Sequence, residues 1–567
     1  MTSKIAKKST QSEQSISTDS SIDSNNTESN NLTTDEIFRL TDLYFYKKNY
    51  IFRHLYDSYN KFLEEDVKNF LETTNHIFNE KITDDIVYRR KFRFKNIRII
   101  GPKLGNGIEP MFPSDARHRN LTYSVKIVAD IQQLQEKIDI HTNIKEEKIT
   151  GVEEQNVPIA ILPLMVRSKY CSLSQYKGND KNECDFNPGG YFIVNGSEKV
   201  VICQERMVEN KALVFLKKDS GVSSYIVQVN SRSYRPNGMM QVLNVKIKSD
   251  GIMTIRVPIL QEVNVFILFR ILGIQSDKDI INLIVSDMSD SDMIDVIRIS
   301  LDACKNESGQ KIQTIEEATD YLINKLRIAR KYNQTNPEIM NNQKKMLLNH
   351  LLKTSFIPHI EGGYKEKAFY LGYMINKLLR VYLGRAEVDD RDSYLNKRVD
   401  LVGDLLMELF KQSFKIMMSE CKKFFDNRND NDDKPINIIN QIKPNTIEQK
   451  IKTSLLTGAW IRKKGVAQML QCYTYLQILG FLRRVDSPSG DASSSKLIGP
   501  RQLHPSSVPF LCPVQTPEHA KVGVTKHLSI ISSMTIMSYD QFLVLRKMLA
   551  MEMFIECLLL VLQGKAY

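Results

Sequence analysis

The sequence predicts a multidomain α+β protein, and three observations support this. With 567 residues the chain is too long for a single hydrophobic core, so about three or four domains are expected. Its composition, 42% hydrophobic and 25% charged, is that of an ordinary soluble protein. Some segments alternate apolar and polar residues as strands do, while others repeat apolar residues at helical spacing. Both kinds of element are therefore expected.

Charge and cysteine usage narrow the class of protein only slightly. The 78 Lys and Arg against 66 Asp and Glu give a net charge of +12. This excess permits a polyanionic partner, but a generic basic surface explains it equally well. The eight cysteines contain no CxxC pair, and the N-terminus lacks an apolar leader. Reduced thiols in an intracellular protein are expected, without a zinc site.

The first part of the chain changes from polar to structured sequence. Residues 1–34 are rich in Ser, Thr, Asn, Asp and Lys, which predicts a disordered tail. Residues 35–79 have helical periodicity, and strand-like alternation follows at 91–100 and 121–132. Between these two strands, residues 110–124 are predicted to form a loop. Its basic residues are expected to have a structural role: Arg117, His118 and Arg119.

A β-hairpin is predicted around Asn195-Gly196, since this dipeptide is a strong turn signal between strands 191–194 and 199–203. Charged residues accompany the hairpin: Glu198, Lys199, Glu205 and Arg206. They fit either an acid/base site or an ion-paired, solvated rim, and the rim is favoured because charges beside turns are usually solvated.

Residues 214–383 are predicted to be a separate unit. It contains strand-like segments at 227–236, 238–250 and 251–260, followed by helical segments at 263–274 and 277–299. Beyond it, three aspartates raise the possibility of a metal site: Asp389, Asp390 and Asp392. Basic residues are interleaved with them (Arg391, Lys397 and Arg398), so salt bridges and helix caps are favoured over metal binding. Residues 422–444 are polar and Asn-rich, which predicts a surface loop.

The segment 460–530 has the pattern of a nucleic-acid contact. Apolar residues at helical spacing predict a helix from Gly465 to Leu482, followed by Arg483 and Arg484. An exposed tract rich in Ser, Asp, Pro and Gly continues to Gly499. Basic and amide side chains flank this tract, which suits contact with phosphates and base edges. The alternative is that the arginine pair is a solvated helix end.

Several motifs together resemble one family. RRVDSPSG, PRQLHPSS and CPVQTPEHAKVGVTKHLS, in that order, resemble the fork region of the second-largest (β-type) subunit of multisubunit DNA-directed RNA polymerases. GGYFIVNGSEKVVICQERM and DDRDSYLNKRVDLVG resemble its protrusion, and RVPILQEVNVFILFRILGI resembles its lobe. The implied domains are protrusion at 35–213, lobe at 214–383, protrusion again at 384–444 with the Asn-rich loop, fork at 445–535 and a divergent helical end at 536–567.

The resemblance assigns roles to individual residues but makes none of them catalytic. Those implied to face the RNA–DNA hybrid are Lys463, Lys464, Gln468 and Gln471. Arg483 and Arg484 would lie near its downstream edge. Those implied to border the active centre are Arg501, Gln502 and His504, with Glu518 as indirect support. No metal or cofactor is expected in this chain, because the family's catalytic Mg²⁺ ions are held by other chains.

The chain also departs from the family pattern. Gln515 and His519 stand where the family has a glutamate and a glycine in the CPVQTPEH turn, and His519 matters if that position needs a positive φ. Residues 536–567 fit the family poorly, so the sequence is expected to be the N-terminal part of a subunit, split or truncated. Its apolar stretch is interrupted by Glu552 and Glu556, which predicts a packed helix and no membrane span.

The expected function is a contribution to template-directed RNA synthesis: cleft wall, strand separation and hybrid support. The expected partners are the DNA template and RNA–DNA hybrid, the largest polymerase subunit, the C-terminal remainder of the β-type subunit and other polymerase subunits. The resemblance implies a eukaryotic RNA polymerase II-like subunit or the version of a large DNA virus. The expected location is the nucleus or cytoplasm, or a virion or viral factory if the protein is viral. No phosphate loop, HExxH or nucleophile elbow indicates a free-standing enzyme. The alternative is a non-catalytic nucleic-acid-binding or assembly protein derived from the same fold.

Overall fold

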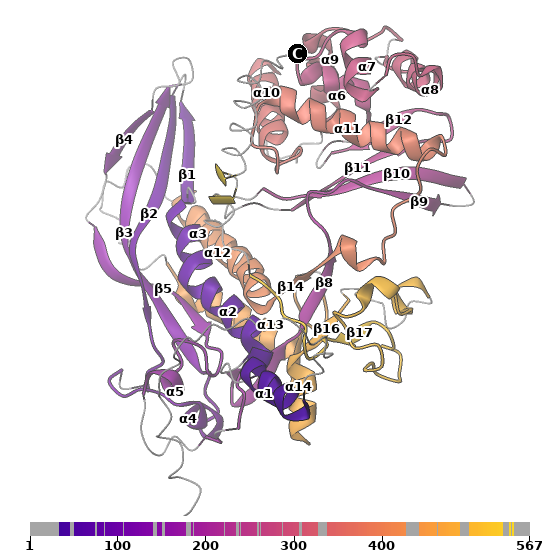
Figure 1. Ribbon diagram of the computed structural model, residues 1–567. Helices are drawn as coiled ribbons and strands as arrows, with labels where there is room; N and C mark the ends of the chain where they lie inside the picture. The colour runs from indigo at the N-terminus through magenta and orange to yellow at the C-terminus, as the bar shows by residue number, and fades with distance from the viewer. Residues whose placement is uncertain are drawn as a thin grey trace, which may run out of the picture. The chain divides into compact units, whose positions relative to one another are not determined.

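The computed structural model (Figure 1) describes residues 33–536 and four residues up to 548. Within this range it leaves out 46–49, 74–75, 84–85, 106, 140–144, 150–152, 177–182, 185, 220–221, 234–237, 239, 258–259, 261, 286, 306–308, 327–336, 427–441, 462 and 488–497. Almost all of the predicted N-terminal tail, most of the Asn-rich loop, the polar tract after Arg484 and nearly all of the C-terminal end therefore lie outside the described residues.

The described residues form helices and several sheets, which is a mixed α+β architecture as predicted. The first compact unit is residues 1–50, of which α1 (Thr34–Phe45) is the described helix. The second unit, residues 51–567, contains two large hydrophobic cores.

The first core lies between an antiparallel sheet and a layer of helices (Figure 1). The sheet contains β1 (His76–Thr83), β2 (Ile86–Ile100), β3 (Ser124–Asp139), β4 (Lys145–Ile149) and β5 (Glu154–Pro163), with β4 and β5 pairing different parts of β3. The helical layer contains η1 (Tyr50–Phe52), α2 (Arg53–Lys61), η2 (Phe62–Asp66), α3 (Val67–Thr73), α12 (Val402–Asp426) and α13 (Pro444–Thr457). Segments more than 300 residues apart thus share one core.

Two expectations for this region need correction. The predicted helix to residue 79 ends at Thr73, because His76 already begins β1. The predicted loop 110–124 contains a short helix, α4 (Pro113–His118). Pro113 occupies its first turn, and the Asp115 carboxylate accepts a hydrogen bond from the Phe112 N–H at 3.1 Å. Both are helix-start signals that periodicity alone does not detect in so short an element.

Two buried histidines make this core sensitive to acid. His54 and His76 are 5% exposed, and burial lowers their pKa values to about 3 and about 4. His76 donates from Nε2 to the Leu71 carbonyl at 3.1 Å and packs against Phe94 and Phe414. Both rings are therefore neutral in the folded chain at neutral pH, whereas an unfolded histidine titrates near pH 6.5.

We expect the free energy of unfolding to fall as the pH falls from 6.5 toward 4, because the unfolded chain binds protons that the folded histidines reject. At about pH 5 each histidine should cost about 2 kcal/mol relative to about pH 7.5. His76→Phe should remove the part of this pH dependence that His76 supplies, about 2 kcal/mol at about pH 5. Urea unfolding at both pH values, followed by fluorescence of the single tryptophan, measures this. An unchanged pH dependence in the variant would contradict the assignment.

The second core is formed by the region predicted to be a separate unit. Its antiparallel sheet runs in sequence order through β9 (Leu213–Asp219), β10 (Val222–Ser231), β11 (Gln241–Ile247), β12 (Met253–Arg256) and β13 (Glu262–Asn264). Its helices are α6 (Val265–Ile271), α7 (Asp277–Ile284), α8 (Ser291–Asp302), α9 (Ile315–Lys325), α10 (Pro337–Thr354) and α11 (Tyr364–Tyr382). The strands and helices predicted between 227 and 299 are confirmed in type, but their limits differ: β10 begins earlier, at Val222, and the stretch predicted as helical from 277 to 299 contains α7 and α8, which ends at Asp302.

Two small sheets bring distant parts of the chain together. The predicted hairpin is confirmed as β6 (Phe192–Val194) and β7 (Ser197–Val201), with positive φ at Asn195 and Gly196, and β15 (Ala467–Met469) pairs with β7. The other sheet has the order β14-β8-β16-β17 (Figure 1). Its strands are β8 (Cys203–Met207), β14 (Lys397–Asp400), β16 (Arg484–Asp486) and β17 (Thr525–His527). The remaining short elements are α5 (Ser172–Gln175), η4 (Tyr394–Asn396), η5 (Gly499–Arg501) and η6 (Pro505–Ser507).

The helix predicted from Gly465 to Leu482 is wrong in its first half. Gly465 has a φ of +73°, and Ala467–Met469 is the strand β15. Only α14 (Tyr475–Leu482) is helical, and the Thr474 side chain caps its start by accepting from the Gln477 N–H at 3.2 Å. A strand of three residues is too short for its own alternation to outweigh helical spacing. Its pairing with β7, more than 260 residues earlier, decides the conformation.

Candidate nucleic-acid interface

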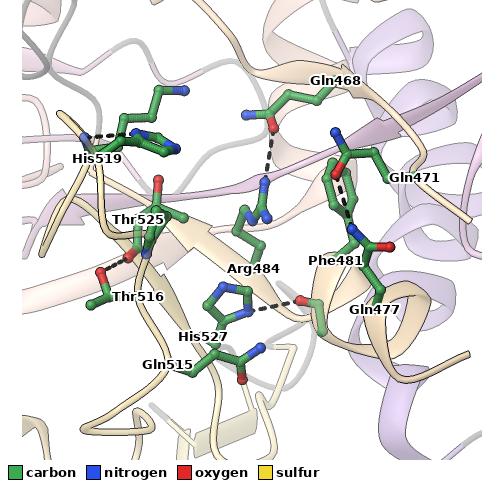
Figure 2. Close-up of a pocket in the computed structure, with 13 residues that line it drawn as sticks. Gln468, Gln471, Gln477, Phe481, Arg484, Gln515, Thr516, His519, Thr525 and His527 are labelled. Carbon is green, nitrogen blue, oxygen red and sulfur yellow. Dashed lines mark hydrogen bonds between the residues drawn. The ribbon is translucent and has the colours of Figure 1, made fainter. Parts of the chain in front are cut away.

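A polar cavity of about 420 Å³ opens between β15, α14, β16 and the turn that leads into β17. Figure 2 shows its lining, with Arg484 near the middle and Gln468 beside it. The lining residues are Gln468, Gln471, Gln477, Gly480, Phe481, Arg484, Gln515, Thr516, Pro517, His519, Lys521, Thr525 and His527. Amide, hydroxyl and cationic groups dominate it, so it suits a polar, anionic ligand.

Arg484 is held in place by two neighbours. Its Nη1 donates to Gln468 Oε1 at 3.2 Å, and its guanidinium lies 4.3 Å from the centre of the Phe481 ring. Burial lowers its pKa, and nearby Asp486 opposes this. Because an arginine stays charged in proteins, the result is an oriented cation facing the cavity.

Two other titratable groups at the cavity are shifted toward their neutral forms. Asp486 accepts from Gln468 Nε2 at 3.3 Å, and burial raises the pKa of its carboxyl group. His527 Nδ1 donates to the Gly480 carbonyl at 2.9 Å, because a carbonyl only accepts. Burial, and then the charge of Arg484, lower the pKa of His527. Its ring is therefore neutral near pH 7 and cannot replace Arg484 as the cation.

Hydrogen bonds also fix the cavity's amides and its far wall. Gln477 Nε2 donates to Gln471 Oε1 at 3.2 Å (Figure 2). Thr516 Oγ1 donates to the Thr525 carbonyl at 3.0 Å and accepts from the Gly523 N–H at 2.9 Å. These bonds close the Pro-rich turn onto β17.

Arg483 lies elsewhere, although it is adjacent to Arg484. It is 5% exposed, and its guanidinium donates to the carbonyls of Ile51, Ser529 (2.6 Å) and Ser532 (3.0 Å). The interpretation of both arginines as a solvated helix end is therefore wrong for Arg483. The adjacent side chains diverge, one into the protein and one toward the cavity.

The other expected site residues fall outside the cavity lining. Arg501 Nη1 donates to the carbonyls of Ala520 (2.7 Å) and Val522 (3.0 Å), and Lys463 pairs with Asp400 at 3.3 Å. His504 contacts Asp390 through Nε2 at 2.7 Å and Ser506 Oγ through Nδ1 at 2.6 Å. The exposed members of the set are Lys464, Gln502 and Glu518. Of the expected residues, the cavity thus brings together Gln468, Gln471 and Arg484, and contact with nucleic acid stays a prediction for all of them.

The sequence reasoning missed several lining residues. They are Gln477, Phe481, Thr516, His519, Lys521, Thr525 and His527. Spacing could not reveal the site, because α14 supplies Gln477 and Phe481, whereas the β16–β17 register places His527 opposite Arg484. The concern about His519 does not arise, since its φ is not positive. Instead its Nδ1 accepts from the Lys521 N–H at 3.3 Å and stabilises the turn.

Gly523 lies in the turn that leads into β17, close to the segment Arg501–His504, which we call the RQLH turn. Its φ is +71°, and a Cβ there would lie 2.1 Å from the Arg501 carbonyl oxygen. We expect Gly523→Ala to destabilise the chain by about 2 to 3 kcal/mol through backbone strain and the displaced carbonyl. Gly465→Ala also replaces a glycine with positive φ, but a Cβ there meets nothing within 4 Å. Urea unfolding should rank Gly523→Ala clearly below this control, and equal losses would contradict the close-contact argument.

The three aspartates that raised the possibility of a metal site are engaged with the protein. Asp389 accepts from Val214 N–H and Lys377, Asp390 accepts from His504, and Asp392 lies 3.7 Å from Lys397. Within the described residues, no group of three or more His, Cys, Asp or Glu side chains is arranged to hold a metal ion. In the same part of the chain, no helix combines the length and hydropathy needed to cross a bilayer.

Comparison with known proteins gives consistent matches. A family model described as RNA polymerase beta subunit matches residues 50–449, and one described as RNA polymerase Rpb2, domain 3, matches residues 468–534. DNA-directed RNA polymerase subunit 2 of Acanthamoeba polyphaga mimivirus is 38% identical over 518 residues, covering 88% of this chain and 43% of that protein.

Cellular proteins give similar coverage. DNA-directed RNA polymerase II subunit RPB2 of Eremothecium gossypii is 32% identical, covering 89% of this chain and 43% of that protein. DNA-directed RNA polymerase subunit Rpo2 of Saccharolobus solfataricus is 29% identical, covering 89% and 42%. The chain thus spans less than half the length of these relatives.

Proposed function

The chain belongs to the RNA polymerase β-subunit family, and from this premise we propose that it contributes to DNA-directed RNA synthesis as the N-terminal part of a second-largest subunit. We assign residues 35–213 and 384–444 to the protrusion, residues 214–383 to the lobe and residues 445–535 to the fork, so that in this proposal protrusion and fork both contribute side chains to the first core. In this proposal the nucleotidyl transfer takes place in the assembled polymerase, whose catalytic Mg²⁺ ions are held by other chains.

The single observation that carries the nucleic-acid role is the oriented Arg484 in an amide-lined cavity. A nucleic-acid duplex that must move past a protein is best held through its phosphates, because phosphate contacts carry no sequence information. Arg484 supplies the charge, Gln468 orients it by accepting from its guanidinium, and Gln471 supplies an amide that bonds to phosphate or sugar oxygens. Lys464, Gln502 and Glu518 are exposed, and we propose that they extend this surface toward the hybrid and the active centre.

Purification of the chain from its native source tests the assembly part of the proposal. We expect it to co-purify with a largest polymerase subunit and with a polypeptide equivalent to the remainder of the relatives. The complex should extend RNA on a DNA template when Mg²⁺ and nucleoside triphosphates are present. A stable complex that lacks these partners and makes no RNA would reject this function and favour a non-catalytic binding protein.

Arg484→Ala tests the nucleic-acid part. We expect the lifetime of the elongation complex to fall about tenfold at low salt, as for loss of one charge-assisted contact. Each phosphate contact releases counterions, so the variant should also show a shallower dependence of lifetime on salt, by about one unit of log–log slope. The difference from the parent protein is therefore greatest at low salt.

The matched control is Arg398→Ala. Arg398 is an exposed arginine outside the cavity that donates only short-range bonds, to the Leu395 and Lys397 carbonyls. It should leave both the lifetime and the salt slope unchanged. An Arg484→Ala complex as long-lived as the parent at every salt concentration would show that Arg484 does not hold the hybrid.

A further inference from the structure

Glu205 is a buried carboxylate that neither the expected acid/base site nor the expected solvated rim explains. It is 2% exposed, so the rim interpretation is wrong for this residue. Its oxygens accept from Lys526 Nζ at 3.1 Å, from Ser487 Oγ at 2.8 Å and from the Tyr394 hydroxyl, and Lys397 Nζ lies at 3.7 Å. Although burial opposes ionisation, Lys526 and Lys397 outweigh it and lower the pKa of Glu205, which is therefore charged.

The partners of Glu205 come from three segments that are distant in sequence. Tyr394 and Lys397 belong to η4 and β14, Ser487 directly follows β16, and Lys526 lies in β17. Together with β8, which carries Glu205, they include every strand of the β14-β8-β16-β17 sheet or its immediate extension. One carboxylate thus joins all four strands.

Strand geometry places this cluster directly behind the cavity. Lys526 lies between Thr525 and His527, which both line the cavity, so its side chain points to the opposite face of β17. On β16, Val485 lies opposite Lys526 in the register, between Arg484 and Asp486. Its side chain is therefore on the same face as Lys526, and the Arg484 side chain is on the cavity face. Glu205 therefore binds β17 and the residue that follows β16 on one face of the sheet, while Arg484 projects from the other face.

A second connection reaches the RQLH turn. Ser506 Oγ accepts from the Tyr394 N–H at 2.8 Å, and the same hydroxyl contacts His504 Nδ1 at 2.6 Å. Tyr394 thus contacts Glu205 through its hydroxyl and the RQLH turn through its backbone. The cluster thus lies behind the strand that carries Arg484 and is linked through Ser506 to His504, and both residues are expected to meet nucleic acid.

We propose that Glu205 is a positioning residue, which sets the geometry of Arg484 toward the hybrid by fixing β16 and β17 from their buried face. It touches no substrate itself. The inference rests on the proposed function, because it concerns the same nucleic-acid contact. It goes beyond that function by assigning control of the contact to a residue on the opposite side of the sheet.

A double-mutant cycle in the assembled polymerase tests this. Glu205→Gln keeps the size and an acceptor for Ser487 but removes the charge. We expect it to shorten the elongation-complex lifetime about fivefold and to give the shallower salt slope expected of Arg484→Ala. In the Arg484→Ala background, Glu205→Gln should shorten the elongation-complex lifetime by less than about twofold, because the contact that Glu205 positions is already absent. Simple loss of stability would leave the salt slope of the folded complexes unchanged.

Controls separate the outcomes. Glu209→Gln removes a carboxylate that pairs with Arg206 and Arg232, outside the Glu205 cluster, and it should alter neither the lifetime nor the salt slope. If Glu205→Gln fails to assemble, Ser487→Ala is the second variant, since it removes one bond of the cluster. It should shorten the lifetime about twofold in the parent protein and have a smaller effect in the Arg484→Ala background. Additive effects with an unchanged salt slope would overturn the positioning role. No effect of Arg484→Ala alone would instead overturn the proposed function.

Discussion

Replacing Arg483 by alanine is expected to lower the free energy of unfolding by about 4 kcal/mol, a large share of the about 5 to 15 kcal/mol that stabilises a typical domain. The guanidinium donates to carbonyls from two segments, at Ile51 and at Ser529 and Ser532. Removing it leaves three partly buried carbonyls without this donor and leaves a cavity where the 5% exposed side chain lay. Arg483→Lys should recover only part of the loss, since one ammonium cannot reproduce the planar fork.

Trp460 provides the measurement. It is the single tryptophan, it is 1% exposed in the first core, and its Nε1–H donates to the Leu405 carbonyl at 3.0 Å. Its fluorescence should report unfolding of the same core that Arg483 stabilises. Arg484→Ala is the matched control and should cost no more than about 1 kcal/mol. Equal losses for the two arginines would show that their side chains do not have different roles.

Glu205→Ala should have a comparable effect, about 3 to 5 kcal/mol, because it leaves Lys526 and Lys397 buried without their shared counter-charge. The Lys526 and Lys397 side chains are 15% and 11% exposed, so water cannot substitute for the carboxylate. Adding Lys526→Met should recover part of the loss by removing one of the stranded ammonium groups.

Urea unfolding of the single and double variants measures this coupling. The double variant is expected to be more stable than Glu205→Ala alone, which is the opposite of additive behaviour. Lys521→Met is the control addition, because Lys521 lines the cavity and is not part of the Glu205 cluster, and it should recover no stability. If Lys526→Met lowers stability further in the Glu205→Ala background, the charge-cluster argument fails.

Local signals in the sequence were sufficient for much of the fold. The Asn195-Gly196 hairpin, the long strands β2 and β3, and the helices α6, α7 and α8 follow from turn chemistry and periodicity over several residues. The strand at Ala467–Met469 could not be predicted in this way. Its conformation depends on pairing with Val200 and Val201, and nothing within its own three residues encodes that partner.

The candidate site was predictable in its charged and amide residues and not in its geometry. Arg484 and Gln468 stood out by type and position, but the different directions of Arg483 and Arg484 arise from β16 pairing on both sides. The burial of Glu205 was unpredictable for the same reason. A carboxylate beside a turn is usually solvated, and only the arrival of Lys526 and Tyr394 from distant segments encloses it.

The chain enters and leaves the second core at nearly the same point. Asp389 Oδ2 accepts from the Val214 N–H at 2.8 Å, and the Asp389 N–H donates to the Val214 carbonyl at 2.9 Å. A segment whose two ends meet can be removed or exchanged without moving the strands that flank it. The Val214–Asp389 pair thus marks a permissive junction. Gene duplication or protein engineering could replace the segment between these two residues with another module while β8 and β14 stay paired.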